Sequence, residues 1–159
     1  MPSLRRALLL CVLALSTPLL AGTDLVKWRT VIDGEKEARS SGKPILYFMT
    51  AEWCGPCHMM KRAVFQDAQI ADFINKEYIP VAVVDRVAED GRNPPDVQRL
   101  QVKFQLQGFP TLAVARFGAE GALTTGGWDS KEQTVRFLRT AKQQMAQAEK
   151  ADRGKVKPR

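Results

Sequence analysis

Two cysteines separated by two residues constrain this chain more than any other feature. Cys54 and Cys57 lie in the segment 53–58, which reads WCGPCH. An apolar, strand-like run at residues 43–50 precedes them, and residues 58–65 have helical character, so Cys54 is expected at the N-terminus of a helix. There, unpaired backbone N–H groups and the helix dipole favour the thiolate, which is the nucleophile in disulfide exchange. The pattern therefore predicts a dithiol–disulfide pair that opens and closes reversibly.

Three other interpretations of the motif are weaker. A structural zinc site needs four ligands, whereas the chain offers only Cys11 and His58 besides the motif cysteines. A permanent structural disulfide would close such a short loop that it would stabilise the fold only modestly. Capture of Cu(I) by the two thiolates stays open as a rival. We expect no resident metal and no cofactor.

The charge of the chain is concentrated at its ends. The formal net charge is +7 over 159 residues, but Arg5, Arg6 and the basic residues of the segment 142–159 carry most of it. Residues 23–141 are left near neutrality, and no basic stripe with interleaved aromatic residues occurs among them. The composition therefore argues against a nucleic-acid partner and fits one domain with appendages.

The first 22 residues have the layout of a secretory signal. Arg5 and Arg6 precede an apolar core at residues 7–15, and small residues follow at 21–22. We expect a signal peptide over 1–22 and a periplasmic or secreted protein, although an uncleaved anchor is an alternative. After cleavage, the only cysteines left would be those of the motif, in an oxidising compartment.

The remaining residues predict alternating helices and strands. Expected helices are 28–40, a segment from 57 that Asp67 caps as it continues, 96–103, and a last one that begins with capping-box chemistry near 129–133. Expected strands are 44–50, 78–85 (buried on both faces), 111–117 and 122–126. This order predicts an α/β fold with a central mixed β-sheet flanked by helices on both faces. The domain is expected over 23–142, and a basic tail over 143–159.

This order and three short segments resemble the thioredoxin superfamily. The segments are AEWCGPC at 51–57, GFPT at 108–111 and Gly126-Gly127, and the resemblance covers roughly residues 26–142. The chain is also similar to the C-terminal domain of bacterial transmembrane disulfide reductases. The resemblance implies a thioredoxin fold in which Pro110 is cis and faces the disulfide. It also implies that the backbone at Phe109 pairs with an extended substrate segment.

Each expected site residue has a distinct role. We expect Cys54 to attack a partner's disulfide and to be the more exposed cysteine, and Cys57 to resolve the mixed disulfide. The family's buried aspartate is replaced here by Phe48, so Glu52 is the nearest acidic candidate to handle the proton of Cys57, unless it is a solvated carboxylate. The resemblance adds Pro110 to these catalytic residues. Expected substrate contacts are Trp53, Gly55, Pro56, Phe109 and Gly127.

These features predict a monomeric thiol–disulfide oxidoreductase. Its expected substrates are proteins that contain disulfides, and a membrane protein is the expected electron donor if it works as a reductase. The alternative is a binding module of the same fold, a chaperone or copper-handling protein that seldom turns over. The basic tail is expected to be solvated, or to contact an anionic membrane or acidic partner.

Overall fold

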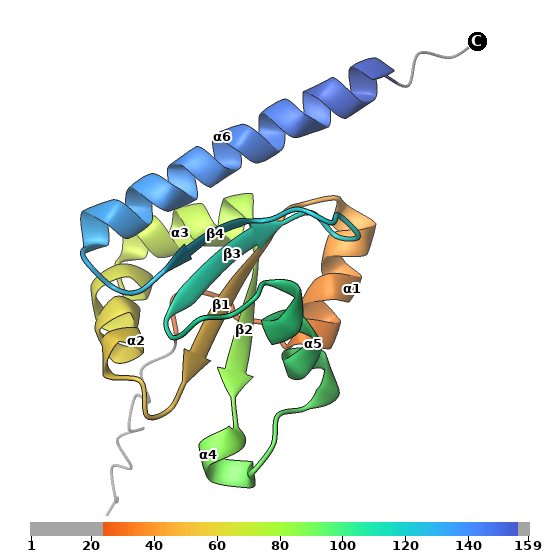
Figure 1. Cartoon of the computed structure of the whole chain (residues 1–159). Helices are drawn as coiled ribbons and strands as arrows, with labels where there is room; N and C mark the ends of the chain where they lie inside the picture. The colour runs from red at the N-terminus through yellow and green to blue at the C-terminus, as the bar shows by residue number, and fades with distance from the viewer. Residues whose placement is uncertain (1–23, 156–159) are drawn as a thin grey trace, which may run out of the picture.

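One mixed sheet of four strands organises the molecule, in the order β2-β1-β3-β4 (Figure 1). The computed structural model describes residues 24–155, and their side chains as far as residue 151. The central strand β1 (Ile45–Ala51) runs parallel to β2 (Ile79–Asp85) and antiparallel to β3 (Thr111–Ala115). The hairpin partner of β3 is β4 (Leu123–Gly126). The sheet is mixed, as the sequence predicts.

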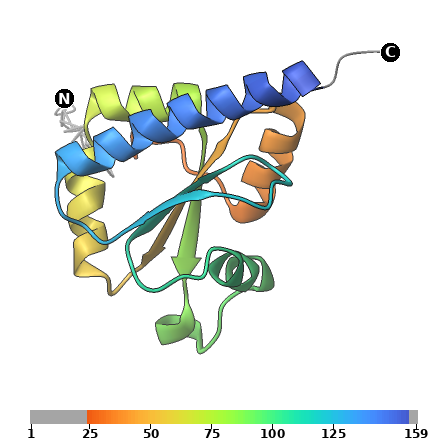
Figure 2. The same ribbon diagram turned by 45° about the horizontal axis from the view of Figure 1, so that its top comes forward.

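Helices cover both faces of the sheet, so the fold has three layers (Figure 2). One face packs against α1 (Val31–Ser41) and α5 (Pro95–Lys103). The other packs against α2 (Gly55–Met60), a π-helical turn η1 (Lys61–Phe65), α3 (Ala68–Glu77) and α6 (Lys131–Lys155). A short helix α4 (Val87–Asp90) links β2 to α5. The predicted fold class is confirmed.

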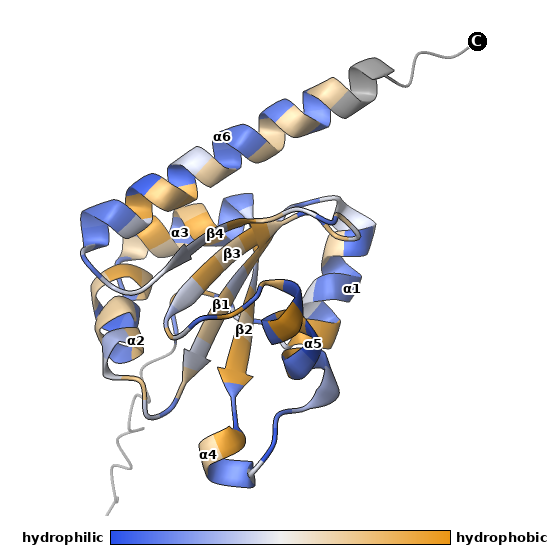
Figure 3. Cartoon of the chain, in the orientation of Figure 1, coloured by the Kyte–Doolittle hydropathy of each residue, from blue (hydrophilic) through white to orange (hydrophobic). Residues whose placement is uncertain are grey.

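The two cores follow from the alternation of side chains along β1. Leu46 and Phe48 point to the face that contains Cys57, whereas Tyr47 and Met49 point to the face covered by α1 and α5. Because helices cover both faces, every residue of β1 is buried. This explains the uninterrupted apolar run that the sequence shows there, and Figure 3 shows the hydrophobic strands between helices with hydrophilic outer faces.

Local hydrogen bonds fix the starts of two helices where the sequence predicts them. The carboxylate of Asp67 accepts from the N–H groups of Gln69 at 3.0 Å and Ile70 at 3.1 Å, which caps α3. The hydroxyl of Ser130 accepts from the N–H of Gln133 at 3.2 Å at the start of α6. Asp67 also pairs with Lys131 at 2.7 Å, so the same side chain joins α3 to α6.

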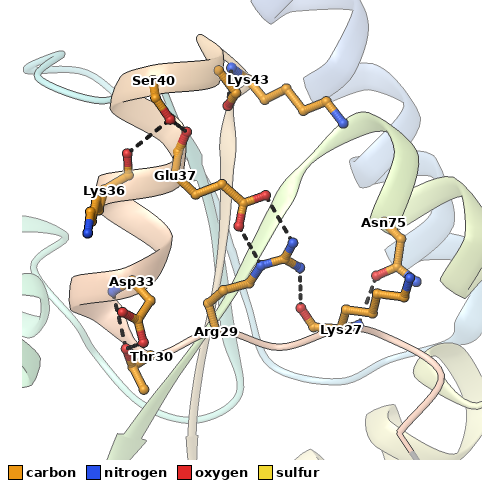
Figure 4. Close-up of polar contacts among 10 residues, drawn as sticks. Lys27, Arg29, Thr30, Asp33, Lys36, Glu37, Ser40, Lys43 and Asn75 are labelled. Atoms are coloured by element: carbon orange, nitrogen blue, oxygen red, sulfur yellow. Dashed lines mark hydrogen bonds and ion pairs between the residues drawn. The ribbon is translucent and has the colours of Figure 1, made fainter.

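The first predicted helix begins three residues too early. Helix α1 starts at Val31 with Thr30 as its N-cap, because Arg29 pairs with β2 at Val81 instead of entering the helix. The guanidinium of Arg29 binds Glu37 at 2.8 Å and 3.0 Å and also contacts the carbonyl of Lys27, which ties this segment to α1 (Figure 4). Ile32, an apolar residue of the first turn of α1, is 69% exposed.

Two further features differ from the prediction. Strand β2 lies at an edge of the described sheet, so Ala82 and Val84 are half-buried rather than buried on both faces. Helix α4 has no counterpart in the prediction.

Helix α6 continues past residue 142 without a break, and its C-terminal half extends beyond the sheet (Figures 1 and 2). No helix between residues 24 and 155 has both the length and the apolar character needed to cross a bilayer. The predicted signal at 1–22 lies outside the described residues.

Candidate functional site

The two motif cysteines form a disulfide just beyond the carboxyl end of β1. Their Cα atoms lie 5.3 Å apart. Cys54 has an extended backbone and is the N-cap of α2, and Pro56 occupies the first turn, where a missing N–H costs no hydrogen bond. The predicted strand-to-helix junction is present, with the helix starting at Gly55.

A backbone donor points directly at the sulfur of Cys54. The N–H of Cys57 donates to Cys54 Sγ at 3.2 Å, and the N–H of His58 donates to the carbonyl oxygen of Cys54 at 3.2 Å. The first of these hydrogen bonds can stabilise negative charge on Sγ when the disulfide opens. Cys54 is 2% exposed and Cys57 is 0% exposed. Cys54 is therefore the more exposed cysteine only by a small margin, and both sulfurs are covered in the oxidised form.

The loop before β3 lies beside the end of β1. The Phe109–Pro110 peptide bond is cis, as the resemblance implies. The carbonyl of buried Pro110 accepts from the N–H of Gly127 at 2.8 Å, and Gly127 has a left-handed φ of 78°, which favours glycine. Strand β3 pairs with both β1 and β4. The loop before β3 is therefore held between the end of β1, which leads to the disulfide, and Gly127, which follows β4.

Trp53 and Phe109 form an aromatic rim between the motif and this loop. Their ring centroids lie 5.7 Å apart in an edge-to-face arrangement. Trp53 is 61% exposed, and the next-door residues Gly55 and Pro56 are exposed as well. The structure thus brings the predicted substrate contacts of the motif together with Phe109 and presents them at the surface.

The acidic candidate Glu52 is an exposed residue. Its carbonyl oxygen lies 2.8 Å from Nε2 of His58, which must donate because a carbonyl only accepts. This hydrogen bond from His58 therefore stabilises the turn before Cys54. Phe48 is buried in the same core cluster as Cys57, so no carboxylate occupies that position.

A buried carboxylate that the sequence analysis did not single out lies on the strand next to the motif. Asp85 ends β2 and stands opposite Ala51 in the register. Burial works against its charge, but hydrogen bonds from Asn93 at 2.6 Å, Gln101 at 2.9 Å and the N–H of Val87 at 3.2 Å outweigh burial and hold the pKa of Asp85 below its usual value. The sequence contained one signal for this residue, because Asp85 is an aspartate at the end of an apolar run that predicts a strand.

Within the described residues, no three His, Cys, Asp or Glu side chains gather as a metal-binding group. The site consists instead of a closed disulfide at a helix start, a cis-proline loop and an aromatic rim. This arrangement can exchange the Cys54–Cys57 disulfide with another thiol or disulfide brought to the rim.

Known proteins share this fold and part of this sequence. A family model described as a thioredoxin-like domain matches residues 33–142. The thioredoxin of Acidithiobacillus ferridurans is 32% identical over 106 residues, which cover 65% of this chain and 84% of that protein. The thioredoxin of Allochromatium vinosum is 33% identical over 104 residues, which cover 65% and 85%.

Solved structures show the same fold at lower sequence identity. The DsbH oxidoreductase matches with a TM-score of 0.61 and 20% identity, over 80% of this chain and 90% of that chain. The oxidised C-terminal domain of Neisseria meningitidis DsbD matches with a TM-score of 0.55 and 17% identity, over 69% and 90%.

Proposed function

The chain belongs to the thioredoxin-like domain family and is a thiol–disulfide oxidoreductase, and we propose that it works as a reductase of protein disulfides in the periplasm or outside the cell. The observation that carries the proposal is the Cys54–Cys57 pair closed at the start of α2 around Gly55-Pro56. A Gly-Pro pair between the cysteines resembles reducing thioredoxins, and the hydrogen bond from the Cys57 amide favours a thiolate at Cys54.

The proposed reaction proceeds in two exchanges. In the reduced protein, the thiolate of Cys54 attacks one sulfur of a partner's disulfide, which forms a mixed disulfide and releases the partner's other sulfur as a thiolate. Cys57 then loses its proton and attacks Cys54, which forms the Cys54–Cys57 disulfide and releases the second partner thiolate. Two electrons pass to the partner, whose thiolates take up protons. A dithiol donor must then reduce the protein again, and we assign this role to a membrane protein.

Glu52 is the proposed acceptor of the proton that Cys57 loses. Support comes from its place two residues before Cys54 and from the absence of a carboxylate at Phe48. A Glu52→Gln variant tests the role, because loss of the base should slow the second exchange more at pH 6 than at pH 9. A solvated carboxylate without this role would leave the pH profile unchanged.

The remaining site residues are proposed as contacts to the partner. Trp53, Gly55 and Pro56 are exposed beside the disulfide, and Phe109 packs edge to face against Trp53. The backbone of Phe109 is proposed to pair with an extended partner segment, and the N–H of Gly127, which donates to the carbonyl of Pro110, supports this loop. A monomer suffices for this chemistry, since one chain supplies both cysteines.

The periplasmic location depends on residues 1–22 as an export signal. We propose that the catalytic domain spans 23–142 and that 143–159 form a basic extension. Cell fractionation together with N-terminal sequencing of the purified protein tests this. A protein that stays in the cytoplasm with residue 1 retained would contradict it.

The reduction potential of the Cys54–Cys57 pair tests the direction of electron flow. The protein would be equilibrated with glutathione or dithiothreitol buffers, and the fraction of dithiol measured by thiol labelling. A potential of about −270 mV or lower supports a reductase. A potential of about −120 mV belongs to strong oxidants and would overturn the proposal.

A further inference from the structure

A buried hydroxyl on the central strand has no hydrogen-bond partner while the disulfide is closed. Thr50 lies near the carboxyl end of β1 and is 2% exposed. Its Oγ1 is shielded from solvent and makes no hydrogen bond with the part of the chain that the structure describes. A hydroxyl buried in this way loses its bonds to water without replacement, which costs free energy of folding. Valine has the same shape without this cost, so packing alone gives no reason for threonine here.

The side chain of Thr50 points to the face of the sheet that carries the cysteines. Side chains alternate along a strand, and the core cluster that contains Cys57 also contains Leu46 and Phe48 of β1. Thr50 is the next residue in this alternating series, and it lies closer to the end of β1 from which the chain leads to Cys54. Figure 1 shows α2 beside this end of the strand. The hydroxyl therefore lies on the cysteine side of the sheet.

The side chains that flank Thr50 within the sheet offer it no polar atom. Phe48 precedes it on the same face, and Val84 stands opposite it on β2. On its other side, the antiparallel register of β1 and β3, continued by one residue, places Pro110 opposite Thr50. Toward the carboxyl end of β1, the same face leads to the sulfurs at the start of α2. A cysteine sulfur is therefore the partner that this position favours.

The two sulfurs differ in their hydrogen-bond donors. Cys54 Sγ accepts from the N–H of Cys57 at 3.2 Å. The sulfur of Cys57 accepts no hydrogen bond from residues 24–151, and Cys57 is 0% exposed. In the second exchange Cys57 must nevertheless lose its proton, and burial without a donor disfavours the thiolate. The step that resolves the mixed disulfide therefore requires a donor that the closed form does not show.

We propose that the hydroxyl of Thr50 donates a hydrogen bond to the sulfur of Cys57 once the disulfide is open. Opening moves the two sulfurs from bonding to non-bonded distance, which frees Cys57 Sγ to meet a donor. The hydroxyl keeps its own proton, and the proton of Cys57 goes to the base, for which Glu52 is proposed above. The Cys57 thiolate then attacks Cys54 Sγ, the bond from Cys54 to the partner breaks, and the partner sulfur leaves as a thiolate. The proposal rests on the exchange proposed above and adds a residue to its second step.

Dithiobis(nitrobenzoate) separates the two exchanges in one experiment. Reduced protein releases one thionitrobenzoate when Cys54 attacks the reagent, at a rate proportional to the reagent concentration. It releases a second when Cys57 resolves the mixed disulfide, at a rate independent of that concentration. Stopped-flow absorbance follows both phases between pH 6 and 10. The variants are Thr50→Val, which lacks the hydroxyl, and Thr50→Ser, which keeps it.

Thr50→Val is expected to slow the second phase about three- to fourfold below pH 8 and to leave the first phase within about twofold of wild type. One lost hydrogen bond to a thiolate lowers the ionisation constant of Cys57 about tenfold, and the higher nucleophilicity of a more basic thiolate offsets part of this loss. The difference should narrow toward pH 10, where Cys57 ionises in both proteins. Thr50→Ser should keep the wild-type second phase.

The oxidised proteins supply a second readout, with Thr134→Val as the matched control. Thr134 is also buried, but its hydroxyl donates to the carbonyl of Ser130 at 3.1 Å while the disulfide is closed. Thr134→Val should therefore lower the melting temperature of the oxidised protein and leave both phases unchanged. Thr50→Val loses no hydrogen bond in this form and should melt at the wild-type temperature or above.

Three results would overturn the role of Thr50. These are a wild-type second phase in Thr50→Val at every pH, a Thr50→Ser variant as slow as Thr50→Val, and a lower melting temperature of oxidised Thr50→Val. Failure of the proposed exchange looks different. In that case the first phase of reduced wild type is no faster than that of its Cys54→Ser variant, whereas failure of the Thr50 role leaves the first phase intact.

Discussion

Trp53 and Phe109 meet edge to face with their ring centroids 5.7 Å apart, although one precedes the cysteine motif and the other the cis-proline. The contact joins the two segments that border the disulfide. Trp53 is nevertheless mostly exposed, so its ring contributes little buried area to the fold. An exposed tryptophan that packs on a half-buried phenylalanine at the edge of a reactive site is better explained by contact with a partner than by packing.

We predict that Trp53→Ala slows reduction of a protein disulfide several-fold while it lowers the free energy of unfolding by only about 1 kcal/mol. Trp28→Ala is the matched control. Trp28 packs against Phe48 and Phe65 in the core, so its truncation should cost about 3 kcal/mol or more. Urea unfolding and an insulin-reduction assay measure the two effects. Equal destabilisation by both substitutions would show that Trp53 is a packing residue.

The assigned order of the cysteines predicts which variant traps a partner. Cys57→Ser leaves Cys54 free to attack but removes the thiol that resolves the mixed disulfide. Covalent complexes should therefore accumulate on non-reducing gels and disappear with dithiothreitol. Cys54→Ser should trap far fewer, since the amide of Cys57 donates to Cys54 Sγ and favours its thiolate, whereas the sulfur of Cys57 is fully buried. More complexes with Cys54→Ser than with Cys57→Ser would reverse the assignment.

Signals that act along a short stretch of chain were sufficient for much of the fold. The apolar run of β1 predicts a strand, and Asp67 predicts the start of α3, because apolar patterning and capping act within a few residues. The cysteine motif likewise predicts the disulfide at a helix start, since both sulfurs come from one turn of chain.

Features that depend on distant partners could not be predicted in the same way. Trp28 fits the helical pattern, yet Arg29 pairs with Val81 and delays the helix. The network around Asp85 needs Asn93 from a loop and Gln101 from α5.

Gly34 shows the same dependence on a distant partner and yields a test of the packing. Alanine normally stabilises a helix relative to glycine by about 0.5–1 kcal/mol. At Gly34, however, a Cβ atom would lie 2.2 Å from Cγ2 of Val81, so α1 could not keep its distance from β2. We predict that Gly34→Ala destabilises the protein by about 1–3 kcal/mol in urea unfolding.

Gly121→Ala is the control for this substitution, because nothing lies within 4 Å of the added Cβ and the backbone is not left-handed. It should change the free energy of unfolding by less than about 0.5 kcal/mol or raise it slightly. A Gly34→Ala variant as stable as this control would mean that α1 and β2 are not packed as closely as described.

The carboxylate of Asp85 predicts a pH-dependent contribution to stability. Asp85→Ala leaves the amides of Asn93 and Gln101 without their acceptor, so at pH 7 the variant should be about 1–3 kcal/mol less stable than wild type. Because the folded pKa of Asp85 is lowered, the wild-type advantage is complete above the unfolded value of about 4. It should decline as the pH falls below that value toward the folded pKa.

Urea unfolding of both proteins at pH 7, 5, 4 and 3 measures this difference, with exposed Asp72→Ala as a control that should stay within about 0.5 kcal/mol of wild type at pH 7. The advantage of wild type over Asp85→Ala should be equal at pH 7 and 5 and smaller at pH 3. An advantage that grows as the pH falls would mean that the folded protein favours protonated Asp85. The hydrogen bonds from Asn93 and Gln101 would then not outweigh the cost of burying the charge beside the redox site.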